Sequence, residues 1–225
     1  MNIASPRLPL AAIAAMLLGC GDASVTSTRI APEDSELAAN RASHSVSAVY
    51  RFADMGEVGS SMLSRHGNSI SMTFKTSDIP PGMAVTIWWV VFNRPWNCST
   101  SPCGEPDIFD PAVMADVLYA AGHVTGAADR VNYGAQLRAG DADGSVMGFF
   151  NALLALDLPS VGLRNVHGAE VHLVARTHQE ALPAFMPDMI STFNGGCGYP
   201  PGVPTDYGAE GPNTCTDIQF AIHQP

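Results

Sequence analysis

Four histidines are the side chains of this chain best suited to bind a metal ion. Two of them, His172 and His178, lie in the run 170–178, where alternate side chains of an extended strand share one face. Glu170 and Arg176 belong to that same face, so imidazoles and a carboxylate come together. Imidazole with carboxylate suits zinc or copper. The pattern therefore predicts a zinc or copper site with the candidate ligands His172, His178, His223 and His123.

This predicted site needs a second strand, at the C-terminus. In the run 217–223 the polar side chains occupy one face and the apolar side chains the other: Asp217, Gln219 and His223 against Ile218, Phe220 and Ile222. If the two strands are neighbours, a single polar patch carries several imidazoles. Two alternatives stay open. The histidines can be solvated positions on half-buried strands, or single side chains bonded to backbone groups.

Familiar catalytic motifs are missing from the sequence. The run 59–63, Gly-Ser-Ser-Met-Leu, lacks the last glycine of a nucleophile elbow. The run 141–145, Asp-Ala-Asp-Gly-Ser, looks like the start of a calcium loop, but Ala152 stands where the bidentate glutamate is needed. We therefore predict no catalytic residue and a non-catalytic binding or structural role. A metal-dependent enzyme that uses the histidine and carboxylate face is the alternative.

Four cysteines in the body of the chain are expected to form two disulfides. Their even number in an exported chain supports pairing. Three pairings are possible, and the simplest joins sequence neighbours, Cys98 with Cys103 and Cys197 with Cys215, around loops rich in Pro and Gly. A four-cysteine zinc site is the alternative, but the Cys-x-x-Cys spacing of zinc ribbons does not occur.

A fifth cysteine, Cys20, ends a short export signal. Arg7 precedes the apolar run 8–18, and Gly19 supplies a small residue at the cleavage site. The run is shorter than the roughly 20 residues that a membrane-spanning helix needs. Residues 17–20, Leu-Leu-Gly-Cys, resemble the lipobox of bacterial lipoproteins, which implies that Cys20 is acylated and becomes the mature N-terminus. An ordinary cleaved signal is the alternative.

The lipobox implies a protein of the bacterial cell envelope, held by acyl chains such as palmitate and facing the periplasm or the cell surface. Gly21, rather than an aspartate, follows the cysteine, which favours the outer membrane. Residues 1–19 are then the signal peptide. Residues 20–44, rich in Ala, Ser, Thr and acidic side chains, are predicted to be the lipidated N-terminus and a flexible tether. Residues 45–225 are long enough for a single domain with its own core.

The chain is acidic, with few charged residues. Its formal net charge is −10, and loss of Arg7 with the signal makes it −11. Lys75 is the one lysine, and no run of basic residues occurs, so we expect no nucleic-acid partner. Docking on anionic lipid through charge is disfavoured as well, so the acyl chains are the expected link to the membrane. An envelope protein or a glycan is the other partner class that we expect.

Alternating and continuous apolar runs predict an all-β domain. The run 84–92 is apolar on both faces, as in a central strand that is covered on each side. A short helix is expected over 112–119, and the run 146–156 fits either a strand or a helix. Seven or eight strands between Gly and Pro turns favour an antiparallel β-sandwich, jelly-roll-like or Ig-like, with short helices and disulfide-closed loops. A barrel is disfavoured because the long loops interrupt the strand spacing.

Five segments together resemble a family of exported bacterial proteins: residues 88–93, 98–104, 170–178, 195–197 and 215–223. The similarity spans residues 50–223, nearly the whole predicted domain. The family carries no established activity, so the resemblance implies no catalytic residues. The pattern of strands and Gly-His steps also resembles chordin-type (CHRD) β modules.

The lipid anchor gives the first testable prediction. Replacing Cys20 by serine removes the thiol that accepts the lipid, so we expect the protein to move from the membrane fraction to the soluble periplasmic fraction. Fractionation of cells that make the wild-type protein or C20S, followed by immunoblotting, measures this change. Unchanged membrane association of C20S would show that Cys20 is not the anchor.

Overall fold

The structure is a computed structural model that describes residues 42–128 and 130–225. The predicted signal, Cys20 and nearly all of the predicted tether lie outside these residues. In the described part, no helix is both long enough and apolar enough to cross a membrane. In chain order the elements are β1 (Ser43–Arg51), β2 (Glu57–His66), β3 (Ser69–Ser77), β4 (Met83–Phe92), η1 (Pro95–Asn97), η2 (Glu105–Phe109), β5 (Ala115–Val124), β6 (Arg130–Arg138), α2 (Met147–Leu154), β7 (Glu170–Glu180), η3 (Pro183–Phe185), α3 (Asp188–Ser191), η4 (Thr205–Tyr207) and β8 (Thr216–His223).

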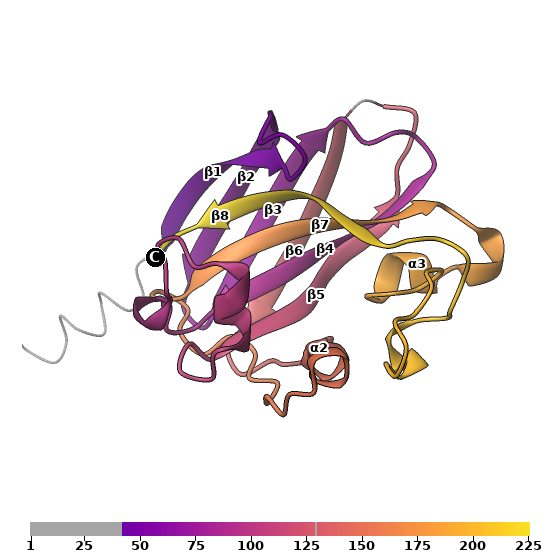
Figure 1. Cartoon of the computed structure of the whole chain (residues 1–225). Coiled ribbons are helices and arrows are strands. Elements are labelled where there is room, and N and C mark those ends of the chain that lie inside the picture. Colours follow the sequence, from indigo (N-terminus) through magenta and orange to yellow (C-terminus); the bar gives the residue numbers. More distant parts are fainter. Residues whose placement is uncertain (1–41, 129) are drawn as a thin grey trace, which may run out of the picture.

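The strands form one antiparallel sheet in the order β5-β4-β7-β8-β1-β2-β3-β6. The sheet curls until its two end strands, β5 and β6, contact each other, so the domain is nearly barrel-shaped (Figure 1). The predicted all-β antiparallel fold with short helices and disulfide-closed loops is confirmed. Strands that a sandwich would divide between two sheets belong here to a single continuous sheet, whose curl gives it an inside and an outside.

The inside of the curl holds the larger core. The alternation of apolar and polar residues over 69–76 predicts a strand with Ile70, Met72 and Phe74 in the core, and β3 confirms this, since all three are buried. Every strand contributes inward side chains to this core, among them Leu63 from β2 and Tyr133 from β6. Burying a large apolar side chain contributes about 1.5–3 kcal/mol, so this core supplies much of the drive for the curl.

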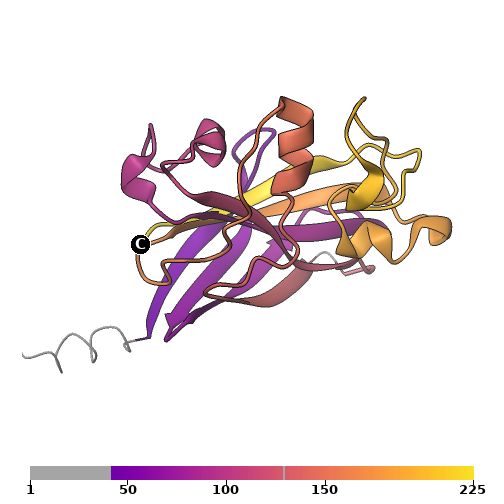
Figure 2. The same ribbon diagram turned by 90° about the horizontal axis from the view of Figure 1, so that it is seen from below.

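Strand β4 is buried on both faces, as the sequence predicts. Its neighbours Trp88 and Trp89 point in opposite directions: Trp89 enters the inner core and Trp88 enters a second core on the outside of the sheet. The outer core lies under α2, the loop closed by Cys98–Cys103 and the segment that follows α3 (Figure 2). Both disulfides join the neighbouring cysteines, Cys98 with Cys103 and Cys197 with Cys215, so the simplest of the three pairings is confirmed.

One strand, β2, is missing from the sequence-based predictions, and one segment differs from them. β2 carries mostly small and polar residues, which hide its alternation, and its pairing with both β1 and β3 makes it a strand. The helix predicted over 112–119 is wrong. Strand β5 begins at Ala115 because this segment pairs with the edge of β4, and tertiary pairing of this kind overrides local propensity.

A bulge in β8 corrects the prediction that Asp217, Gln219 and His223 share one face. Ala175 pairs with Gln219 but Arg176 pairs with Asp217, so Ile218 is an extra residue at this point of the strand. Asp217 therefore points outward with Arg176, whereas Gln219 and His223 point into the curl. There the two ring nitrogens of His223 lie 2.9 Å from the hydroxyl oxygens of Ser45 and Ser61.

The buried His223 makes the stability of the fold depend on pH. Burial, with a contribution from Arg65, lowers the pKa of His223 to about 4, whereas an unfolded histidine has a pKa of about 6.5. Between these values the unfolded chain binds a proton that the folded chain does not, so stability falls as the pH falls. We expect His223 to remove about 2 kcal/mol from the free energy of unfolding between pH 7 and pH 5.

Urea denaturation at both pH values measures this loss. The variant His223→Gln keeps groups that can bond Ser45 and Ser61 but has no proton to take up, so its unfolding free energy should fall by about 2 kcal/mol less. An identical fall in the wild type and in H223Q would exclude His223 as the source.

Candidate functional site

The outer face of β4 and β7 forms the floor of a cleft. Side chains alternate along each strand, so every second residue of both strands points to this face. The floor consists of Trp88, Val90 and Phe92 from β4 and His172, Val174 and Arg176 from β7. The prediction that His172 and Arg176 share a face is therefore confirmed. Three segments rise around this face and leave the cleft between them.

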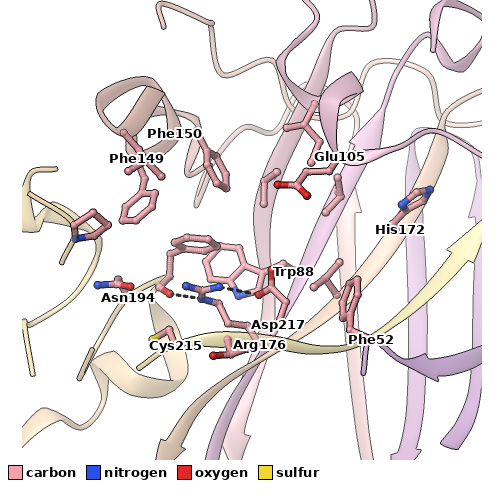
Figure 3. Close-up of a pocket in the computed structure, with 18 of the residues that line it drawn as sticks. Phe52, Trp88, Glu105, Phe149, Phe150, His172, Arg176, Asn194, Cys215 and Asp217 are labelled. Atoms are coloured by element: carbon pink, nitrogen blue, oxygen red, sulfur yellow. Dashed lines mark hydrogen bonds and ion pairs between the residues drawn. The ribbon is translucent and has the colours of Figure 1, made fainter. Parts of the chain in front are cut away.

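Three segments make the walls, and each contributes apolar side chains. Helix α2 contributes Phe149 and Phe150, which project toward the floor in Figure 3. The turn η2 contributes Ile108 and Phe109. The third wall is the segment 193–217, with Phe193 at its start. Rings from α2 and Phe193 meet with centroids 5.0–5.5 Å apart, so these two walls pack against each other.

A single carboxylate holds the segment that carries α2. Asp116 of β5 is fully buried, and it accepts hydrogen bonds from the Ser145 hydroxyl before the helix and from the backbone N–H groups of Val161 and Gly162 after it. Burial raises the pKa of Asp116 above its usual value, although these hydrogen bonds offset part of that rise. Because both ends of the segment attach to one side chain, α2 is fixed over the sheet.

The other two walls are closed by the disulfides. Cys98–Cys103 closes the loop before η2, and the Asp107 carboxylate of η2 accepts hydrogen bonds from the backbone N–H groups of Ser99 and Gly104 within it. Cys197–Cys215 closes the third wall. All three walls are therefore tied covalently or by buried hydrogen bonds, and the cleft between them is preformed.

The cleft has a volume of about 780 Å³. Binding pockets for small molecules usually measure about 300–1,000 Å³ and are lined mostly by apolar and aromatic groups. Floor and walls here match that description, with polar groups at the two ends (Figure 3).

One end of the cleft contains an arginine whose charge is already paired. Arg176 donates from Nη1 to the Asp217 carboxylate at 2.8 Å and from Nε to the carbonyl oxygen of Phe193 at 2.9 Å. Its guanidinium also lies 4.1 Å from the centroid of the Phe193 ring. The bulge in β8 makes the ion pair possible, because it turns Asp217 outward. Arg176 therefore ties the third wall to the floor.

The other end contains a histidine oriented by a buried carboxylate. Glu170 Oε1 lies 2.7 Å from His172 Nε2 and accepts a hydrogen bond of 2.7 Å from the Cys103 backbone N–H. A carboxylate oxygen that accepts from a backbone N–H is an acceptor for the ring as well, so Nε2 carries the proton. The imidazole packs against Phe92 with 4.9 Å between ring centroids. Glu170 thus links the first disulfide loop to β7 through the edge of the cleft.

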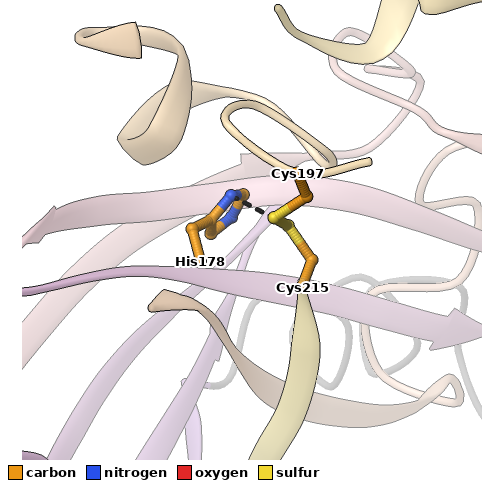
Figure 4. Close-up of side chains that lie close together, drawn as sticks. All are labelled: His178, Cys197 and Cys215. Atoms are coloured by element: carbon orange, nitrogen blue, oxygen red, sulfur yellow. Dashed lines mark hydrogen bonds between the residues drawn. A yellow bond between two sulfur atoms is a disulfide. The ribbon is translucent and has the colours of Figure 1, made fainter. Parts of the chain in front are cut away.

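His178 joins the floor to the second disulfide (Figure 4). The indole N–H of Trp88 can only donate, and it donates to Thr86 Oγ1 at 2.8 Å. The Thr86 hydroxyl then donates to His178 Nε2 at 3.0 Å, which leaves the ring proton on Nδ1 to bond the Gly195 carbonyl at 2.8 Å. Cys215 Sγ lies 3.3 Å from the same Nδ1. Burial lowers the pKa of His178 to about 4, so the ring is neutral near pH 7.

The structure does not gather the four predicted metal ligands. His172 and His178 are six residues apart on one strand, which corresponds to about 20 Å. His223 points into the curl, on the opposite side of the sheet from His172, and His123 stacks on Tyr133 at 4.3 Å between centroids. In residues 42–128 and 130–225, no three of these histidines bring ring nitrogens within 4.8 Å of one another.

Two other groups of possible metal ligands occur in the described residues. One contains His178 with Cys197 and Cys215, and the other contains Asp107 with the Cys98–Cys103 pair. In both groups the sulfurs are joined in a disulfide, so they are not thiolates able to bind a metal.

Comparison of the chain with protein-family models, with curated proteins and with solved structures found no match. The chemistry of the cleft is therefore inferred from its own residues. Sequence reasoning missed this cleft, although one signal was present. Phe149, Phe150 and Phe193 lie outside the strands that account for the inner core, and aromatic residues in such connecting segments must be covered by another surface.

The second disulfide should control the wall that it closes. In the chain-entropy model its loop is worth about 3 kcal/mol and the short Cys98–Cys103 loop about 2 kcal/mol. We expect the double variant Cys197→Ala/Cys215→Ala to lose the larger amount in urea denaturation. We also expect its tryptophan emission to shift to the red, because the chain of hydrogen bonds from Trp88 to Gly195 loses its support.

The variant Cys98→Ala/Cys103→Ala is the matched control. In the described residues no hydrogen bond joins its loop to the chain from Trp88 to Gly195, and Trp96 beside the loop is already 68% exposed, so this variant should lose stability without the red shift. Equal spectra for the two double variants would contradict this role of Cys197–Cys215.

Proposed function

We propose that this protein is a lipid-anchored binding protein of the bacterial cell envelope. Its β domain binds a small apolar or amphiphilic molecule in the aromatic cleft, and the acyl group on Cys20 keeps the domain at the membrane. The observation that carries the proposal is the preformed cleft of about 780 Å³ above β4 and β7.

The lining of the cleft supports an uncharged ligand. Its floor and walls offer rings and branched aliphatic side chains, and each CH₂ group that a ligand buries there contributes about 0.8 kcal/mol. The cleft contains one cation, Arg176, and Asp217 already neutralises it. An anionic ligand would have to displace that carboxylate. An aromatic or acyl group therefore fits better than a phosphate or a carboxylate.

The state of the polar groups supports binding rather than catalysis. A general base or nucleophile must be free to reach its substrate. Three of the polar side chains that line the described part of the cleft are already engaged, whereas Glu105 makes no hydrogen bond there and His172 uses only its Nε2. Arg176 is bound to Asp217 and Phe193, Asn194 donates to the carbonyls of its own loop, and Cys215 is in a disulfide.

An uncharged fluorescent probe tests the cleft. N-phenyl-1-naphthylamine is an apolar aromatic amine that fluoresces strongly in apolar surroundings. We expect saturable binding to the wild-type protein. The variant Val174→Phe should lose at least tenfold in affinity, about 1.4 kcal/mol, because the larger ring fills the floor of the cleft. Fluorescence titration measures both affinities.

Val46→Phe is the matched control for this titration. Val46 has 75% of its surface exposed on β1 and does not line the cleft, so the same substitution there should leave probe affinity unchanged. Binding that is absent in the wild type, or equal in the two variants, would overturn the proposed cleft function.

A further inference from the structure

The C-terminal end of α2 carries an exposed apolar run. Residues 152–156, Ala-Leu-Leu-Ala-Leu, are all exposed and contain no polar side chain. The exposed fractions are 43% for Leu153, 46% for Leu154 and 37% for Leu156. Single exposed leucines are ordinary, but a consecutive run of exposed apolar residues is costly in water and signals an interaction. This run is called the α2 tip below.

Asn151 is the one polar side chain of α2, and the remaining residues are apolar or glycine, which is typical of a helix that is largely covered. One side is covered, because Met147 and Phe149 are buried in the outer core. The α2 tip is the C-terminal end of the helix and the turn after it, where Leu153 follows Phe149 by four residues on the side that borders the cleft. Half of the residues of this helix are therefore apolar or glycine and yet exposed, and no other segment of the described residues covers them.

The α2 tip lies at the mouth of the cleft. Leu153 belongs to both, since it lines the cleft and is also exposed. Phe52, which lines the cleft from the β1–β2 turn, is 48% exposed, and Met55 in the same turn is 59% exposed. Five of the eight large apolar side chains that are exposed in the described residues thus belong to two segments that border the cleft.

The charges near this surface decide which partner it fits. No lysine or arginine occurs from residue 139 to residue 163, and Asp157 directly follows the tip. The β1–β2 turn contains no lysine or arginine, and Arg51, the last residue of β1, is paired with Asp54 and Asp78. Anionic lipid attracts basic segments and would be repelled here. The surface is therefore suited to the uncharged or zwitterionic part of a bilayer.

The chain between the anchor and the domain is long enough for this contact. Twenty-two peptide steps separate Cys20 from Ala42, and a fully extended chain of that length spans about 75 Å. A domain of this size has a radius of gyration of about 16 Å. Figure 2 shows α2 and the start of β1 on opposite sides of the domain, and a domain with that radius of gyration is narrower than the extended chain is long.

We propose that the α2 tip inserts into the interface of a zwitterionic bilayer, so that the cleft opens onto the membrane and takes its ligand from it. The ligand class is then a membrane amphiphile with an acyl chain. This inference rests on the proposed anchor and on the proposed cleft. The leucines of the tip leave water for the acyl boundary, and the mouth beside Leu153 becomes continuous with the lipid phase.

Site-specific quenching tests the insertion. The acylated full chain is purified from bacterial membranes and reconstituted into phosphatidylcholine vesicles that contain nitroxide-labelled phosphatidylcholine. A nitrobenzoxadiazole label is attached in Leu154→Cys at the tip, or in Val46→Cys, which is exposed on β1 and serves as the matched control. We expect at least threefold stronger quenching at position 154. Adding Leu153→Asp to the Leu154→Cys variant should lower its quenching to the level of the control.

The possible outcomes distinguish a failure of this inference from a failure of the proposed anchor or of the proposed cleft. If the chain floats with the vesicles but positions 154 and 46 are quenched equally, or Leu153→Asp has no effect, the inference is overturned and the anchor stands. If the chain does not float with the vesicles, both the anchor and the inference are overturned. Titration of N-phenyl-1-naphthylamine in solution reports on the cleft independently of either result. Because the vesicles contain no other protein, a protein partner for the α2 tip would give the first of these outcomes.

Discussion

Strand β4 is apolar on both faces, so the protein must shield each face from water separately. The sheet shields the first face by curling, which encloses Trp89 and its inward neighbours in the inner core. Curling cannot shield the second face, because Trp88, Val90 and Phe92 point away from the curl. Three connecting segments must therefore be laid over the outside of the sheet. These segments bury the outward side chains of β4, and the space that remains between them is the cleft.

The residues with chemical potential serve mainly to hold these covering segments in place. Glu170 ties the first disulfide loop to β7, Arg176 ties the third wall to the floor, and His178 joins the floor to Gly195 beside the second disulfide. Asp116 does the same for the segment that carries α2. A buried polar group that already has its partners stabilises a structure but is not free to react. Preformed walls also lower the entropic cost of binding, because the protein does not have to order them when a ligand arrives.

The anchor, the disulfides and the cleft form a consistent set in the proposed function. An exported chain can rely on disulfides, and here each bond closes a wall of the cleft. An acyl anchor needs no basic membrane-docking surface, which agrees with a chain of net charge −10. It also keeps the domain beside a store of apolar molecules. The exposed α2 tip at the mouth of the cleft is unfavourable for a protein free in solution but is suited to such a place.

Much of the strand framework could be read from local pattern. The alternation in β3, the apolar β4 between two covering layers, and the shared face of His172 and Arg176 follow from a period of two residues, which depends only on backbone geometry. The disulfide pairing was also accessible to local reasoning, because each bond joins cysteines that are neighbours in the sequence. β2 escaped recognition because its small polar residues hide the alternation, and only its two neighbours make it a strand.

The functional face was decided by the tertiary structure. One extra residue, Ile218, places Asp217 on the outer face of the sheet while His223 lies on the inner face. The local sequence does not predict this bulge, because it depends on how β8 pairs with β7. The same pairing separates the histidines that the sequence suggested as one metal site. Whether an apolar run such as 146–156 becomes a core strand or a helix over a cleft depends on which surface is left to cover. Residue types along the chain determine what must be buried, and the three-dimensional arrangement determines where that burial stays incomplete.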